Sequence, residues 1–231
     1  MKNIAIITAR GGSKRIPRKN IKHFCGKPIL LYSIEAALQA DIFDEVMVST
    51  DDEEIADIAR KAGAKVPFMR SPETSNDFAT TRDVLIEVVN RYRADGVNFD
   101  NVCCIYPTAP FITPEKLRQA MELHMEKDAD SVCPVVRFSF PPQRCYVIED
   151  GMLCYKWPEN ILARSQDLEP FYHDSGQFYT YKTETLLHKE RTEWKEYPLV
   201  LSELEVQDID NEDDWEIAEL KYRYLKEKGQ L

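Results

Sequence analysis

Two glycines and five cations follow directly after a short apolar run near the N-terminus. The run Ile4–Ala9 is rich in β-branched residues, which is typical of a buried strand. The loop after it contains Arg10, Gly11, Gly12, Ser13, Lys14, Arg15, Arg18, Lys19 and Asn20. Because glycine has no Cβ, the backbone N–H groups of such a loop can approach a ligand closely, and surrounding cations suit a polyphosphate. No Gly-Lys-Ser or Gly-Lys-Thr closes the loop, so it is not a Walker A motif. The loop predicts a phosphate site, and a solvated basic turn is the alternative.

A second candidate site lies near the C-terminus, where one residue separates Asp208 from Asp210. We predict a strand over Val206–Asp210, on which both carboxylates would point to the same face. Two such carboxylates form a hard oxygen site for Mg²⁺, which takes its other ligands from phosphate and water. The alternative is that they only precede a helix whose first turn favours acids, as we expect of Asp213 and Asp214. A cationic loop and a metal in one crevice would suit phosphoryl or nucleotidyl transfer.

The elements that must position these residues alternate between strand and helix. Further strands are predicted over Glu45–Thr50, Val66–Met69, Val102–Tyr106, Ser131–Val136, Gln177–Tyr181 and Tyr197–Ser202. Helices are predicted over Pro28–Ala40, from a cap at Asp51 to Ala62, over Thr80–Ala94, after a cap at Thr113, and after a cap at Asn211. This order predicts an α/β fold: a Rossmann-like, three-layer open sheet, mainly parallel, in one domain over residues 1–231. Ligands of such sheets bind beyond the carboxyl ends of the strands, where the cationic loop begins.

The alternation fails over residues 137–171. Pro141, Pro142, Gly151 and Pro158 mark turns there, and Cys145–Ile148 is a short strand-like piece. We interpret residues 137–171 as an insertion, a small arm used in self-association as a homodimer.

The composition excludes several classes of function. Forty acidic against thirty basic residues give a net charge of −10, which argues against nucleic-acid binding because that needs a broad basic surface. No apolar stretch approaches the ~20 residues of a membrane span. The N-terminus enters a predicted strand without a leader segment, so we expect a cytoplasmic protein with no membrane partner.

Residues 9–21 resemble the first motif of the CMP-nonulosonate synthetases, the cytidylyltransferases of sialic-acid-type sugars. Asp208-Ile209-Asp210 with Trp215 resembles their metal motif, and Arg164–Leu168 and Asp174–Tyr179 resemble their sugar-side stretch. The resemblance runs from Ile4 to Trp215 and implies a fold of the nucleotide-diphospho-sugar transferase type. It also implies a reaction: the anomeric hydroxyl of a nonulosonic acid attacks the α-phosphate of CTP, giving CMP-sugar and pyrophosphate, with Mg²⁺ as cofactor.

The resemblance assigns roles by position. It implies that Arg10, Lys19 and Asp210 are catalytic, that Asp208 and Asp210 hold Mg²⁺, and that Asp210 or a metal-bound water takes the proton. The implied nucleotide contacts are Arg10, Gly11, Gly12, Ser13, Lys14, Lys19, Asn20, Arg70, Asp77, Ala79, Thr80 and Thr81. The implied sugar contacts are Tyr106, Gln143, Arg144, Arg164, Gln166, Tyr172, His173, Gln177 and Phe178. Arg164 is assigned to the sugar carboxylate because a guanidinium fork matches it, and a structural surface arginine is the alternative.

One departure from the family pattern concerns the substrate. N-acetylneuraminate enzymes typically carry Gln-Pro-Thr-Ser-Pro after the central strand, where this chain has Tyr106-Pro107-Thr108-Ala109-Pro110. With Arg15–Arg18, Phe140–Arg144 and Tyr172–Asp174, this looks more like the pseudaminic acid cytidylyltransferase branch, whose sugar carries two acylamino groups.

Other readings stay open. CMP-N-acetylneuraminate and CMP-legionaminate synthetases are alternatives within the family. A non-catalytic nucleotide-binding module is the alternative from another class, but it would not need Lys19 together with Asp208 and Asp210.

Overall fold

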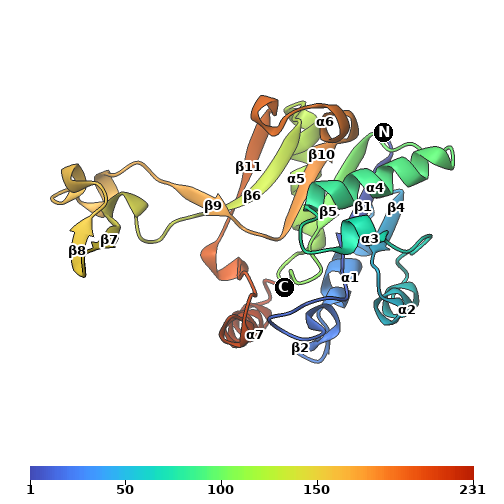
Figure 1. Cartoon of the computed structure of the whole chain (residues 1–231), viewed down its shortest axis with the longest axis horizontal. Helices are drawn as coiled ribbons and strands as arrows, with labels where there is room; N and C mark the ends of the chain where they lie inside the picture. The colour runs from blue at the N-terminus through green and yellow to red at the C-terminus, as the bar shows by residue number, and fades with distance from the viewer.

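One sheet of seven strands forms the centre of the protein (Figure 1). The computed structural model describes all 231 residues. In spatial order the strands are β11 (Glu196–Leu201), β6 (Ser131–Arg137), β10 (Phe178–Lys182), β5 (Asn101–Ile105), β1 (Asn3–Thr8) and β4 (Glu45–Ser49), and β9 (Tyr172–Asp174) also pairs with β6. β1 runs parallel to β4 and β5, and β11 runs parallel to β6, whereas β10 and β9 are antiparallel to their neighbours. The prediction of an open, mainly parallel sheet is confirmed.

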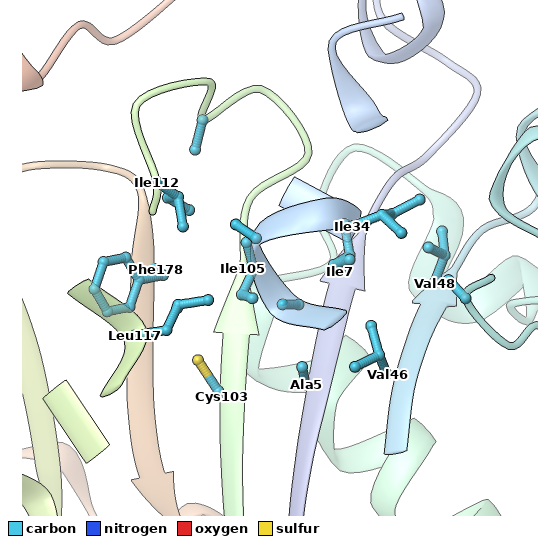
Figure 2. Packing of buried hydrophobic residues seen from close by; sticks show 14 of the residues in the cluster. Ala5, Ile7, Ile34, Val46, Val48, Cys103, Ile105, Ile112, Leu117 and Phe178 are labelled. Atoms are coloured by element: carbon cyan, nitrogen blue, oxygen red, sulfur yellow. The ribbon is translucent and has the colours of Figure 1, made fainter. Parts of the chain in front are cut away.

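Helices cover both faces of the sheet, because side chains of each strand alternate between the faces. Ala5 and Ile7 of β1 belong to a cluster with the helices α1 (Leu30–Ala40), α2 (Glu53–Lys61) and α5 (Pro114–Glu126). Figure 2 shows this cluster, with Ile7 and Ile105 of the strands and Ile34 of α1. Ile4 and Ile6 face the opposite cluster, which includes residues of α4 (Thr81–Ala94) and α6 (Thr183–His188). The three-layer prediction is therefore confirmed.

Two smaller parts complete this body. The short α3 (Pro72–Ser75) precedes α4, and the small antiparallel pair β2 (His23–Phe24) and β3 (Lys27–Pro28) follows the cationic loop. The C-terminal helix α7 (Glu212–Glu227) packs against this pair through edge-on contacts of Phe24 with Trp215 and Tyr222, both at 5.5 Å between ring centroids. None of the helices has the length and apolar character needed to cross a membrane.

Two predicted strands are wrong. Val206–Asp210 forms no ladder, because its carbonyl groups are taken by lysine side chains: Lys221 Nζ donates to Val206 O at 2.8 Å and Lys19 Nζ donates to Ile209 O at 2.6 Å. Val66–Met69 makes no ladder either. The chain runs along the outer edge of β4 with one bridge at Lys65, and Pro67 has no N–H to extend the pairing.

The segment between β6 and β9 leaves the sheet. Its hairpin, β7 (Tyr146–Glu149) with β8 (Met152–Tyr155), lies at the far left end of the molecule in Figure 1, well away from the sheet. Where the two connecting chains rejoin the body, Phe138 N–H donates to Phe171 O at 3.0 Å. We call residues 138–171 the arm; the predicted insertion, residues 137–171, covers this segment.

The buried His124 of α5 should make folding depend on pH. Its ring nitrogens lie 3.1 Å from Asn101 Oδ1 and 3.0 Å from Thr180 Oγ1, and burial lowers its pKa from 6.5 to about 4. Between these values the unfolded chain binds the proton and the folded chain does not, so stability falls as pH falls. From pH 7 to pH 4.5, wild type should lose about 2 kcal/mol more unfolding free energy than His124→Gln in urea denaturation. Equal losses in both proteins would contradict this.

Candidate functional site

A pocket of about 480 Å³ opens where β1 and β5 end. Thr8 lies at the end of β1, and Tyr106, Pro107 and Thr108 follow β5 directly, so the pocket occupies the sheet edge where ligands of open α/β folds bind. Ten of the twelve predicted nucleotide contacts line it: Arg10, Ser13, Lys14, Lys19, Asn20, Arg70, Asp77, Ala79, Thr80 and Thr81. Residues from four separate stretches of the sequence therefore meet in one cavity.

The pocket is strongly cationic. Five basic side chains line it against one carboxylate, that of Asp77. Arg10 Nη1 lies 3.0 Å from Asp77 Oδ1, and Lys14 also pairs with this carboxylate. The ammonium of Lys14, with help from Arg10, lowers the pKa of Asp77 below its usual value. Arg10 and Lys14 thus share a single exposed carboxylate. Because exposed ion pairs are weak, exchanging this partner for a polyanion costs little free energy.

The shape of the cationic loop depends on two aspartates that follow β4. Asp51 Oδ1 accepts a hydrogen bond of 2.8 Å from Gly11 N–H, so this amide does not point at a ligand. A Cβ at Gly11 would come within 2.9 Å of Asp52 Oδ2, so the close packing against Asp52 favours glycine at this position. Gly11 and Gly12 do not line the pocket. For Gly11 this contradicts the predicted role of its N–H in nucleotide binding.

Asp52 also corrects a predicted helix cap. Its side chain, not that of Asp51, caps α2 by accepting from Ile55 N–H at 3.0 Å. Arg18, in a left-handed conformation with φ of 55°, pairs with Asp52 and Glu54. The guanidinium of Arg18 is thereby held on the α2 side of the loop and lowers the pKa of Asp52.

Lys19 joins the pocket to the acidic segment. Its side chain lines the pocket while its ammonium donates to Ile209 O, between Asp208 and Asp210. Burial lowers the pKa of Lys19, and the charges of Asp210 and Asp208 oppose this effect. Beside it, the buried Asn20 donates to Arg10 O at 2.8 Å and fixes the loop backbone. The structure thus brings the two predicted halves of the site together.

Three anchors hold the segment between Glu203 and Asp210 in place of a strand ladder. Lys221 of α7 donates to Val206 O, the buried Gln177 donates to Glu205 O at 2.6 Å, and the buried Lys116 lies 2.9 Å from Glu205 Oε1. Ile209 is buried in one cluster with Ile16 of the cationic loop and Trp215 of α7. These anchors fix the backbone that carries the two aspartates, and the sequence pattern did not indicate Lys116 or Lys221.

The donor set of this segment fits a magnesium ion. Burial, followed by the negative charge of Asp210, raises the pKa of Asp208, and Arg15 Nη2 lies 2.7 Å from Asp210 Oδ1. The two aspartates therefore repel each other, and a cation would relieve this repulsion. No group of three or more His, Cys, Asp or Glu side chains could hold a metal ion by itself. Mg²⁺ is commonly bound by only one or two carboxylates plus substrate phosphates, and Asp208 and Asp210 could supply the carboxylates.

Two further pocket residues have fixed positions. Arg70 is buried and its guanidinium donates to Ser49 O at 2.6 Å and Ser49 Oγ at 3.1 Å, so it holds the end of β4 as well as lining the pocket. Its pKa is lowered by burial. Tyr106 Oη lies 3.1 Å from Thr81 Oγ1, and burial raises the pKa of this phenol.

The predicted sugar contacts are scattered in this chain. Phe178 is 0% exposed within the core, which contradicts a direct sugar contact by its side chain. Gln143 and Gln177 are also buried, and each donates its amide N–H to a backbone carbonyl. Tyr172 and His173 are exposed on β9.

Three of the other four, Arg144, Arg164 and Gln166, lie on the arm and do not line the pocket. Arg164 forms a two-pronged ion pair with Asp167, at 2.7 Å and 3.2 Å. Arg144 Nη1 lies 3.4 Å from Ser165 Oγ, and Gln166 lines a separate surface hollow beside Glu203. Within one chain, only Tyr106 of the predicted sugar contacts lines the cationic pocket.

The sequence and the fold of this chain are similar to those of known proteins. A family model described as Cytidylyltransferase matches residues 4–220. A pseudaminic acid cytidylyltransferase from Campylobacter jejuni is 41% identical over 232 residues, covering 99% of this chain and 100% of the relative. A CMP-N,N'-diacetyllegionaminic acid synthase from Legionella pneumophila is 35% identical over 227 residues, covering 95% of each.

A solved structure, a CMP:2-keto-3-deoxy-manno-octonic acid synthetase complexed with CTP, has a TM-score of 0.73 and 18% identity, covering 97% of this chain and 99% of that chain. It shares the fold of this chain and confirms the predicted fold type. The family match spans both the cationic loop and the Asp208–Asp210 segment, and with the identity to full-length relatives it places this chain in the cytidylyltransferase family.

Proposed function

We propose that this enzyme transfers CMP from CTP to the anomeric hydroxyl of a nonulosonic acid, pseudaminic acid in the first instance, and releases pyrophosphate. The observation that carries the proposal is Lys19, which spans the cationic pocket and the Asp208–Asp210 segment. A nucleoside triphosphate needs cations along its phosphates and a metal site at the reacting phosphate, and Lys19 lies where these two meet. The 41% identity to a pseudaminic acid cytidylyltransferase supports the substrate.

In this proposal, different side chains of the pocket bind the phosphates and the nucleoside. Arg10, Ser13 and Lys14 bind the phosphates, because they form the cationic end of the cavity. Arg10 and Lys14 exchange Asp77 for the triphosphate as it enters. Thr80 and Thr81, at the start of α4, face the nucleoside.

Lys19 would neutralise charge that builds up on the α-phosphate during attack. Asp208 and Asp210 would hold Mg²⁺, which, when bound, orients the triphosphate and neutralises its charge. From the family resemblance, Asp210, which lies beside Lys19 and Arg15, is the carboxylate we assign to accept the proton of the sugar hydroxyl.

We further propose that residues 1–231 form one nucleotidyltransferase domain and that the arm joins two copies of the chain as a homodimer. Apolar side chains of the hairpin lie open to solvent: Ile148 is 76% exposed, Leu153 66% and Met152 64%. A hairpin alone is marginally stable, so such a surface needs a partner. Arg144, Arg164 and Gln166 would then reach the sugar site of the second copy. The cytoplasmic location expected from the sequence stays a prediction.

Pyrophosphate release tests the activity. With CTP and Mg²⁺, pyrophosphate should appear only when a nonulosonic acid is added. The value of kcat/KM should be at least about tenfold higher for pseudaminic acid than for N-acetylneuraminic or legionaminic acid, as expected of a pocket that discriminates one substituent. A higher value for either other acid would change the substrate assignment. CTP binding without turnover of any of the three would show a non-catalytic nucleotide-binding protein.

The metal site can be tested with matched aspartates. Asp208→Asn and Asp210→Asn should each lower kcat by about a hundredfold or more, because a neutral amide replaces one of the two carboxylates proposed to bind Mg²⁺. Both should also raise the Mg²⁺ concentration needed for half-maximal rate. Asp213→Asn, in the first turn of α7, is the control and should keep wild-type kinetics. Near-normal turnover by either of the first two variants would remove that residue from the metal site.

Sedimentation tests the arm. Wild type should sediment as a dimer, and Leu153→Glu should raise the dimer dissociation constant about thirty-fold or more, the effect of losing an interface anchor of ~2 kcal/mol. Leu220→Glu on α7, where Leu220 is 65% exposed, is the matched control and should leave the dimer intact. A monomeric wild type at assay concentrations would refute this assembly.

A further inference from the structure

Arg18, the residue directly before Lys19, has a backbone conformation that is unfavourable for an arginine. Its φ of 55° and ψ of 29° lie in the left-handed region. There the Cβ of an L-residue crowds the following carbonyl oxygen, so glycine adopts this conformation far more readily than arginine does. Such a residue persists only when its surroundings fix it. The contacts around Arg18 must therefore hold this conformation.

The side chain of Arg18 is anchored to the start of α2. Its guanidinium pairs with Asp52 through both terminal nitrogens, with Nη2 lying 3.1 Å from Asp52 Oδ1, and it also pairs with Glu54. Asp52 is itself fixed, because its Oδ1 accepts from Ile55 N–H at the cap of α2 and Ile55 is buried in the core. A planar guanidinium held by two carboxylates has a well-defined orientation. The anchor of Arg18 thus lies on a packed helix and not on another loop.

The left-handed turn at Arg18 sets the direction of the residues that follow. Arg18 O accepts a hydrogen bond of 3.0 Å from Ile21 N–H, which closes the short helix η1 (Lys19–Ile21). This helix carries Lys19, whose ammonium reaches Ile209 O. A rotation of φ at Arg18 to negative values would swing η1 and move the ammonium away from Ile209, because φ and ψ are the soft dihedrals of the chain. The position of this ammonium therefore depends on the backbone conformation of Arg18.

We propose that Arg18 is a positioning residue: its ion pairs with Asp52 and Glu54 hold the left-handed conformation that places the ammonium of Lys19 at the reacting phosphate. Neither Arg18 nor its two partners line the cationic pocket. The start of α2 thereby affects the rate of the reaction without contacting the nucleotide. The inference rests on the proposed function and adds to it a support for Lys19.

Alanine and glycine at position 18 separate the conformation from the charge. Arg18→Ala keeps a Cβ but loses the anchor, so kcat should fall about tenfold or more, as expected when a catalytic group is misplaced. Arg18→Gly also lacks the guanidinium, but glycine adopts positive φ readily, so kcat should return to within about threefold of wild type. The dissociation constant for CTP, measured with Mg²⁺ and without the acid, should stay within about threefold of wild type in both variants, because Arg10 and Lys14 remain.

A double variant tests the partner on α2. Asp52→Asn keeps an oxygen for the helix cap but removes the charge that holds Arg18, so kcat should fall about fivefold or more. In the Arg18→Gly background the same change should alter kcat by less than about twofold, because the anchor is already absent. Arg60→Ala is the matched control and should keep wild-type kcat: Arg60 pairs with Glu53 and Asp57 within α2.

Each outcome has a distinct meaning. Wild-type turnover by Arg18→Ala, or an equal loss in Arg18→Ala and Arg18→Gly, would overturn the positioning role while leaving the activity standing. A loss of CTP affinity as large as the loss of rate, or an equal loss in Arg60→Ala, would overturn it as well. If Arg18→Ala does not fold, Asp52→Asn alone and combined with Arg18→Gly decides the question. No turnover of any acid by the wild type would overturn the proposed function, and this role with it.

Discussion

The hydrogen bond from Lys19 Nζ to Ile209 O, 2.6 Å long, is the contact on which the rest of the site depends. It ties the cationic loop after β1 to the acidic segment before α7. The bond has an electrostatic cost. Burial lowers the pKa of Lys19 and raises that of Asp208. For each group, the loss of hydration therefore outweighs the attraction of the opposite charge. The proposed metal ion and triphosphate would supply the counter-charges that these two buried groups lack.

The reversed strand β10 explains how the other side of the site is built. It lies between β5 and β6 and runs against both, so its first residues lie at the carboxyl end of β5. There Tyr106 N–H donates to Gln177 O at 2.8 Å, while the Gln177 side chain holds Glu205 O. One strand start thus positions both Tyr106, beside the pocket, and the segment that carries the aspartates. The start of β10 therefore connects the pocket to the segment proposed to hold the metal ion.

The fold was predictable because the spacing of the hydrophobic residues and the helix-capping residues indicate the same helices and strands along most of the chain. Asn211 with Asp214 and Thr113 with Pro114 start helices where predicted, since caps depend only on neighbouring residues. Two failures are local: the cap of α2 is Asp52, one residue after the predicted Asp51, and Pro67 keeps Val66–Met69 from pairing. The other failures are long-range. Val206–Asp210 has a strand-like pattern, but lysines from distant elements take its carbonyls. The role of Asp51 at Gly11 depends on β4 lying beside β1, and Phe178 was assigned by motif position although its side chain faces the core.

The separation of Lys19 and Ile209 by 190 residues also sets when the site can exist. At a synthesis rate of ~5–20 residues per second, the cationic loop leaves the ribosome about ten to forty seconds before its partner. Through that interval β1, α1 and β4 can pair and pack, but Lys19 remains solvated with the ordinary pKa of a free lysine. Only when Ile209 and Trp215 join Ile16 in their common cluster is the ammonium buried. The nucleotide site is therefore among the last parts of the molecule to mature, although its first residues are among the earliest made.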